Sequence, residues 1–128
     1  MLFQGLKNTK GIKILNSKSQ GDYKSSYYAM NLILNSKSIK YRNKFVLKLK
    51  EKGIQASIYY PHPVPLLRYY KKKYKYQKNE FPNASRIAYN SFSLPVGPHI
   101  KSKEINFMIK SIKNILENIW LNQKLMLE

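Results

Sequence analysis

The chain has 128 residues, of which 43% are apolar, so it is long enough for one domain with a modest hydrophobic core. It contains no cysteine, which excludes disulfides and thiolate metal sites, and no apolar run reaches the roughly 20 residues that a membrane-spanning helix needs. The first ten residues also lack the apolar core of a secretory signal, so we expect a cytoplasmic protein that does not bind a membrane.

The chain is strongly basic, with 24 basic and 6 acidic residues and a net charge of +18. One explanation is a binding surface for nucleic acid or another polyanion. The other is compositional bias, because the excess is almost all lysine and the chain is equally rich in isoleucine, asparagine and tyrosine, which all have A/T-rich codons. Either explanation predicts non-specific adhesion to polyanions at low salt.

The first part of the chain contains one strong strand signal. Residues 5–21 are polar and punctuated by glycine, so we expect turns around the short apolar stretch Ile12–Leu15. Residues Tyr27–Leu34 are rich in aromatic and aliphatic side chains and predict a strand.

A helix is predicted to follow, from an N-cap at Ser38 to a point near Lys52. Three apolar residues recur every four positions and form its buried stripe, namely Tyr41, Phe45 and Leu49. Gly53 stands where a left-handed C-cap belongs.

A second strand is predicted over Ile54–Tyr60, and it must end at residues 61–65, where three prolines alternate with other residues. Tyr59 and Tyr60 would face opposite sides of this strand, so that one lies in the core. The other would line a cleft at the carboxyl end of the strand, where α/β proteins commonly form their sites.

The last part of the chain is expected to hold a basic, tyrosine-rich loop or short irregular helix over Leu66–Glu80, followed by a helix that opens with Pro82. A short third strand over Phe92–Leu94 and a rigid turn over Pro95–Pro98 precede a final amphipathic helix capped by Ser102. The order predicts an α/β protein with a single domain over residues 1–128, built as a small α+β layer of about three short strands backed by helices.

Few side chains suggest chemistry. The two histidines, His62 and His99, are too few for a zinc site, and the acids are not spaced as a catalytic pair. The segment Tyr69–Tyr76 interleaves tyrosine with lysine, which suits a surface that stacks nucleic-acid bases and neutralises phosphates. The alternative is a solvated loop with its tyrosines packed on the domain and its lysines pointing outward.

Four segments together resemble the DegT-type sugar-nucleotide aminotransferases, a family that depends on pyridoxal phosphate. The resemblance runs from about Gly11 to Leu116. Its parts are Tyr41-Arg42-Asn43 with the helix end at residues 49–54, Ile58-Tyr59-Tyr60-Pro61-His62-Pro63-Val64-Pro65, the tyrosines of residues 69–76 with Phe81-Pro82-Asn83-Ala84, and Ser93-Leu94-Pro95-Val96-Gly97-Pro98-His99. Each part is weak alone, and their order and spacing make the match specific.

The resemblance implies the small C-terminal domain of a fold-type I aminotransferase that aminates nucleotide-linked keto sugars as a homodimer. By this resemblance, Tyr59, Tyr60 and His62 are candidates for substrate contact, while Arg42 orients its helix. Many relatives carry a histidine after the Pro-Val-Pro of this loop, where this chain has Leu66 and Leu67, so the sugar specificity stays open.

The parts that carry out transamination lie upstream of the matched region in the family. They are a lysine that forms a Schiff base with the cofactor, an acid on the pyridinium nitrogen and a phosphate cradle. We therefore expect no catalytic or cofactor-binding residue in this chain, pyridoxal phosphate only in the complete enzyme, and a separate or upstream large domain as partner. The chain would be a fragment: a truncated gene, half of a split enzyme or a partial gene model. The competing hypotheses are a small basic nucleic-acid-binding protein and a non-catalytic nucleotide-sugar-binding domain.

Overall fold

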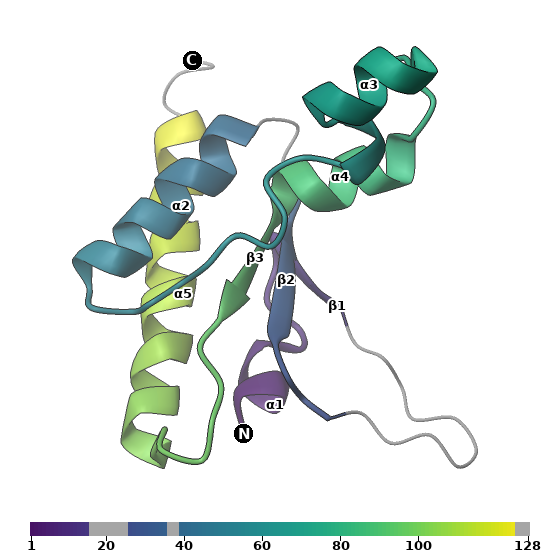
Figure 1. Cartoon of the computed structure of the whole chain (residues 1–128). Helices are drawn as coiled ribbons and strands as arrows, with labels where there is room; N and C mark the ends of the chain where they lie inside the picture. The colour runs from purple at the N-terminus through teal and green to yellow at the C-terminus, as the bar shows by residue number, and fades with distance from the viewer. Residues whose placement is uncertain (16–25, 36–38, 125–128) are drawn as a thin grey trace.

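A computed structural model describes residues 1–15, 26–35 and 39–124 of the chain (Figure 1). In this part of the chain three strands, β1 (Ile12–Leu15), β2 (Met30–Leu34) and β3 (Ser91–Leu94), form an antiparallel sheet in the order β1-β2-β3. Ile12 is opposite Leu34 on one side of the central strand, and Leu94 is opposite Met30 on the other. The central strand is the most apolar of the three, as expected for a strand paired on both edges.

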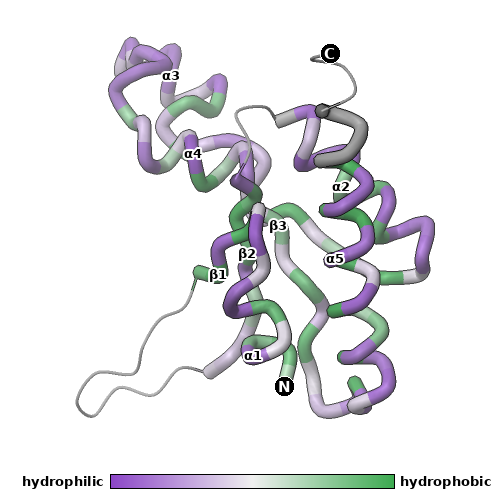
Figure 2. The backbone as a smooth tube through the Cα atoms, turned by 180° about the vertical axis from the view of Figure 1, so that it is seen from behind, coloured by the Kyte–Doolittle hydropathy of each residue, from purple (hydrophilic) through white to green (hydrophobic). Residues whose placement is uncertain are grey.

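Two long helices cover one face of this sheet. They are α2 (Ile39–Glu51) and α5 (Ser102–Lys124), which lie side by side in both views (Figures 1 and 2). A short N-terminal helix, α1 (Leu2–Leu6), packs against α5 so closely that Ile109 fills the space a Cβ on Gly5 would need. No described helix combines the length and the apolar character that crossing a bilayer requires.

The core lies between the sheet and the two long helices. Phe45 of α2 and Phe92 of β3 meet at its centre, with ring centroids 5.1 Å apart. Residues on the inner face of each element complete one continuous cluster, including Leu32, Leu34, Leu49, Leu94, Met108, Ile112, Ile115 and Leu116. Of the three positions predicted for the buried stripe of α2, Phe45 and Leu49 therefore belong to this core, whereas Tyr41 is only half-buried and is not part of the cluster.

The remaining helices lie at the other end of the molecule from α1 (Figure 1). The 3-10 turn η1 (Val64–Leu66) leads into α3 (Arg68–Tyr74), and α4 (Pro82–Asn90) runs directly into β3. Pro82 is the first helical residue of α4, as predicted. The expected loop or irregular helix over Leu66–Glu80 thus contains two turns of regular helix.

The predicted fold class is confirmed: a small α+β layer with three short strands backed by helices. The individual strands differ from the prediction in one important respect. The apolar stretch Ile12–Leu15 is a strand, whereas Ile54–Tyr60 is not, because it meets the sheet only through a single bridge between Ser57 and Ser93. The prolines after Tyr60 stop that pairing before a ladder can form.

The helix ends show how local sequence sets the boundaries. Gly53, just after α2, has a φ of 78°. Its N–H donates to the Lys50 carbonyl at 2.9 Å, and the Ile54 N–H donates to the Leu49 carbonyl at 2.9 Å, so the end of α2 is a Schellman motif.

The predicted cap at Ser38 lies outside the described residues. Ser102 is the first residue of α5 and not its cap; the Glu104 carboxylate accepts the Lys101 N–H at 2.6 Å instead.

Candidate functional site

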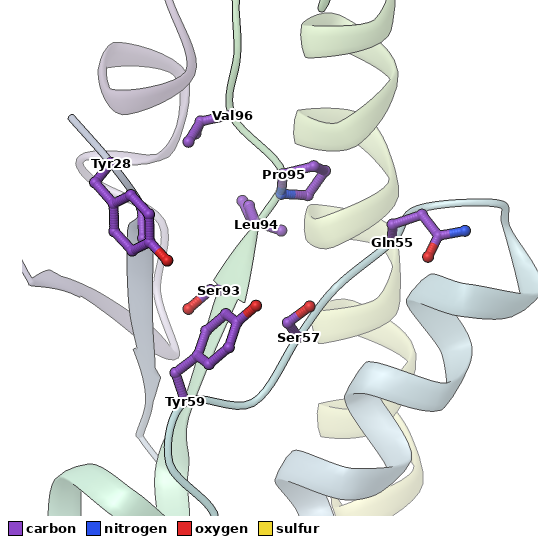
Figure 3. A pocket seen from close by; sticks show the side chains of 9 residues that line it. Tyr28, Gln55, Ser57, Tyr59, Ser93, Leu94, Pro95 and Val96 are labelled. Carbon is purple, nitrogen blue, oxygen red and sulfur yellow. The ribbon is translucent and has the colours of Figure 1, made fainter.

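A small polar cavity opens at the carboxyl end of β3 (Figure 3). Three segments line it: Tyr28 and Ala29 before β2, residues 55–59 beside β3, and residues 93–96 at the end of β3. Its volume is about 260 Å³. The antiparallel register makes this end of the sheet the point where β2 begins and β3 ends, so the segments converge there.

The bridge between Ser57 and Ser93 forms the floor of the cavity. The Ser57 N–H donates to the Ser93 carbonyl at 3.0 Å, and the Ser93 N–H donates to the Ser57 carbonyl at 2.7 Å. The buried Ser93 hydroxyl donates to the side-chain carbonyl of Asn31 on β2. These bonds tie the residue 55–59 segment to the sheet and place Tyr59 just beyond its edge.

The three residues expected to contact substrate occupy different positions. Tyr59 lines the cavity with 55% of its surface exposed, while Tyr60 is 71% exposed and does not line it. The two rings meet edge to face with centroids 6.4 Å apart. The expectation that one of these tyrosines lies in the core is wrong, because the segment is not a regular strand and strand alternation does not apply to it.

His62 lies further along the same loop, exposed to solvent. Its ring packs edge to face against Tyr89 of α4, with centroids 6.1 Å apart. Tyr59, Tyr60 and His62 are therefore all exposed on this loop, but only Tyr59 lines the cavity, and His62 packs against the helix that leads into the start of β3.

Sequence reasoning missed Tyr28, which lines the cavity opposite Tyr59 and is 83% exposed (Figure 3). The predicted strand Tyr27–Leu34 includes this residue, but the strand begins only at Met30. The two serines of the bridge were missed as well. Their only signal in the sequence is that Ser93 interrupts an apolar strand, which is too common to mark a site.

Arg42 is located in the interior and not in the cavity. Its side chain is only 2% exposed, and its guanidinium donates to the carbonyls of Ala88 at 2.8 Å and Ser91 at 3.4 Å. Burial lowers the pKa of this guanidinium from its ordinary value. Arg42 thus joins α2 to the junction between α4 and β3. The strand that begins at this junction, β3, supports the cavity at its other end.

The tyrosine-lysine segment forms a connected row of aromatic rings over α3 and the loop after it. Tyr70 and Tyr74 stack at 6.4 Å with an interplanar angle of 9°, Tyr74 and Tyr76 approach to 5.5 Å, and Tyr76 meets Phe81 edge to face at 5.0 Å. The Lys73 ammonium lies over the rings of Tyr69 and Tyr74 at 5.6 and 5.3 Å. The lysines of this segment are exposed, and Figure 2 shows its hydrophilic character.

The described residues do not fit a metal or a pyridoxal phosphate site. No group of three histidine, aspartate or glutamate side chains comes together among them. The described glutamates are all exposed, as are the described lysines apart from the half-buried Lys48, so no buried acid faces a lysine there. We therefore derive no catalytic step through a cofactor from these residues.

Comparison with solved structures shows a shared fold. The apo form of the Streptococcus pneumoniae protein Spr1654 superposes with a TM-score of 0.81 at 22% identity. The superposition covers 96% of this chain and 30% of the Spr1654 chain. The Helicobacter pylori aminotransferase PseC, involved in pseudoaminic acid biosynthesis, gives a TM-score of 0.76 at 16% identity, over 91% of this chain and 30% of its own.

Curated sequence relatives match in the same partial way. An uncharacterized protein of Methanocaldococcus jannaschii is 29% identical over 94 residues, which are 73% of this chain and 24% of that protein. The spore coat polysaccharide biosynthesis protein SpsC of Bacillus subtilis is 27% identical over 77 residues, 59% of this chain and 20% of its own. The chain thus spans about a quarter of the length of the curated relatives it matches.

The sequence profile of the DegT/DnrJ/EryC1/StrS aminotransferase family matches residues 1–113. This family uses pyridoxal phosphate, and the match extends further toward the N-terminus than the four motifs that carry the resemblance. The chain belongs to the DegT/DnrJ/EryC1/StrS aminotransferase family.

Proposed function

We propose that the chain is the C-terminal substrate-pocket domain of a pyridoxal-phosphate-dependent aminotransferase that aminates nucleotide-linked keto sugars. The observation that carries the proposal is the exposed loop of Tyr59, Tyr60 and His62, whose first residue lines a polar cavity at the end of the sheet. Family membership and a fold shared over 96% of the chain with only 30% of a solved relative support the assignment to one domain of a larger enzyme.

In this proposal the chain contributes substrate contacts and no catalytic group. Tyr59, Tyr60 and His62 contact the nucleotide sugar, and residues 1–128 form one domain. A large domain, on a separate chain or upstream, supplies the cofactor and its lysine, and the complete enzyme is a homodimer. The amino group would come from glutamate, as the family resemblance implies.

The proposal is tested by nuclear magnetic resonance (NMR) titration of the isotope-labelled full chain with UDP-glucose and dTDP-glucose, which are stable nucleotide-linked sugars. We expect saturable shifts at Tyr59, Tyr60 and His62 that persist when salt is raised moderately, and a loss of about tenfold in affinity in Tyr60→Ala. The matched control is Tyr69→Ala, since Tyr69 is a similarly exposed tyrosine (65%) on α3, away from the loop. Shifts confined to α3, or binding that disappears steeply with salt, would contradict the proposal.

The second candidate is a polyanion-binding protein, favoured by the cationic surface of α3. This helix has no acidic residue in its first turn and three lysines in its last turn. In the same titration, that function predicts shifts on α3 whose affinity falls linearly with the logarithm of the salt concentration.

A further inference from the structure

The cavity at the end of β3 has an uncharged lining. Among the described residues that surround it, none carries a charged side chain. Tyr28 lies on one side of Ser93 and Tyr59 on the other, Ser57 lies on the far side of Tyr59 from Tyr28, and the side chain of Gln55 points away from them (Figure 3). The cavity therefore combines two aromatic walls with the hydroxyl groups of Tyr28, Ser57 and Tyr59, each of which can both donate and accept a hydrogen bond, whereas the buried Ser93 hydroxyl already donates to Asn31.

The size and charge of the cavity restrict what it can hold. Its volume of about 260 Å³ lies below the range of about 300 to 1,000 Å³ typical of sites that enclose a drug-sized ligand. A whole nucleotide sugar exceeds that size, so only one of its parts can enter. Diphosphate groups are bound by arginine, lysine, metals or helix N-termini, and this lining offers no cationic side chain.

A pyranose ring matches the remaining chemistry. Its hydroxyls pair with the two tyrosine hydroxyls and that of Ser57, and its C–H faces pack on the aromatic rings, in a site where a few polar groups fix orientation among apolar walls. We propose that the space between Tyr28 and Tyr59 receives the neutral pyranose ring of the nucleotide sugar, and that Tyr28 is a specificity-determining residue. This inference rests on the proposed function and adds the part of the ligand that is bound and a residue that contacts it.

Exposure of both tyrosines supports a ligand-binding role. Tyr28 and Tyr59 are 83% and 55% exposed, although they come from segments 31 positions apart in the chain that the sheet brings to one edge. The Ser57–Ser93 bridge fixes the Tyr59 side, and the pairing of Met30 with Leu94 fixes the Tyr28 side. The backbone is thus held in place before the sugar arrives, which lowers the ordering cost of binding.

The test uses methyl α-glucopyranoside, a neutral pyranose without a nucleotide, titrated into the labelled full chain. We expect saturable NMR shifts at Tyr28, Ser57 and Tyr59 and a loss of about tenfold in affinity in Tyr28→Ala, with a smaller loss in Tyr28→Phe, which keeps the ring. Tyr69→Ala, an exposed tyrosine outside the cavity, should bind as the unchanged chain does. Heteronuclear spectra of each variant report whether it remains folded.

The outcomes separate this inference from the proposed function. Glucoside shifts outside the cavity, absence of saturable shifts, or an unchanged affinity in a folded Tyr28→Ala would overturn the inference even if nucleotide sugars bind through Tyr60. Conversely, glucoside binding that depends on Tyr28, together with no response to UDP-glucose or dTDP-glucose at Tyr60 and His62, would support a sugar site here and refute the proposed nucleotide-sugar function.

Discussion

Arg42 shows how one buried side chain can hold two parts of the domain together. Its guanidinium, 2% exposed, donates to carbonyls on both sides of the α4–β3 junction, Ala88 at 2.8 Å and Ser91 at 3.4 Å. Both carbonyls lose their partner when the side chain is truncated, and a buried unpaired acceptor costs more than a hydrogen bond contributes.

We predict that Arg42→Ala lowers the free energy of unfolding by about 2 to 4 kcal/mol, from the unpaired carbonyls and the cavity left behind. Arg86→Ala, at an exposed position on α4, should change it by less than about 0.5 kcal/mol. Urea denaturation followed by circular dichroism measures both. Equal effects of the two substitutions would show that Arg42 does not stabilise the junction.

At the residue scale, the sequence predicted the segment next to the candidate cavity, but it predicted only one of the two tyrosines that line the cavity. The aromatic pair at the end of an apolar run and the prolines after it located Tyr59, which does line the cavity. Tyr28 was missed because its contact with the cavity depends on the pairing of β2 with β3, which brings together residues more than 60 positions apart. Local patterns carry no information about such long-range pairs. Contact of Tyr59, Tyr60 and His62 with substrate stays a prediction.

At the scale of elements, periodic patterns were the most reliable guides. Two of the three predicted stripe residues of α2, Phe45 and Leu49, and the apolar face of α5 belong to the core, since helical periodicity reports a buried face. The short strands were harder to predict. Ile12–Leu15 and Ile54–Tyr60 both read as short apolar runs, but the first pairs along β2, whereas the second makes only the Ser57–Ser93 bridge to the outer edge of β3 before the prolines.

Gly53 provides a test of an element boundary. Its φ of 78° lies in the left-handed region, and no atom of the described residues would clash with a Cβ at this position. The only cost of a side chain there is therefore the strain of the left-handed backbone conformation. We predict that Gly53→Ala destabilises the domain by about 1 kcal/mol and that Gly53→Asn, which tolerates this conformation better, costs about half as much. Thermal melts of the three proteins give the ranking. A neutral Gly53→Ala would mean that the Schellman motif contributes little to stability.

At the scale of the whole molecule, the chain has a complete core and an exposed exterior that is rich in aromatic and apolar groups. Leu47 of α2 and Phe107 of α5 are exposed, and so are the tyrosines of the candidate site. Exposed apolar groups mark surfaces that bind other proteins or ligands where they gather into a patch. If the proposed function is right, such surfaces would contact the rest of a larger enzyme, since the chain spans 24% of one curated relative and 30% of a solved one.

The net charge of +18 is the remaining feature of the whole molecule, and its distribution decides between a dedicated nucleic-acid site and diffuse adhesion. Stacking of bases needs free aromatic faces, but Tyr70 and Tyr74 stack on each other and Tyr76 packs against Phe81, so that Tyr69, 65% exposed, is the most accessible ring of the segment and offers a small platform on its own. We therefore expect the lysines of α3 to act only through their charge, as any other exposed lysines would.

Two triple variants test this expectation. One replaces Lys71, Lys72 and Lys73 of α3 by glutamine, and the other replaces Lys103, Lys110 and Lys113, which are exposed on α5. Both variants remove the same charge, so we predict equal losses of affinity for single-stranded DNA. We also predict equal reductions in the slope of log affinity against log salt concentration, by about 0.7 for each phosphate that the protein no longer neutralises. Fluorescence anisotropy at several salt concentrations measures both quantities. A loss several-fold larger in the α3 variant would locate a true polyanion site on that helix and favour the second candidate function over the aminotransferase domain.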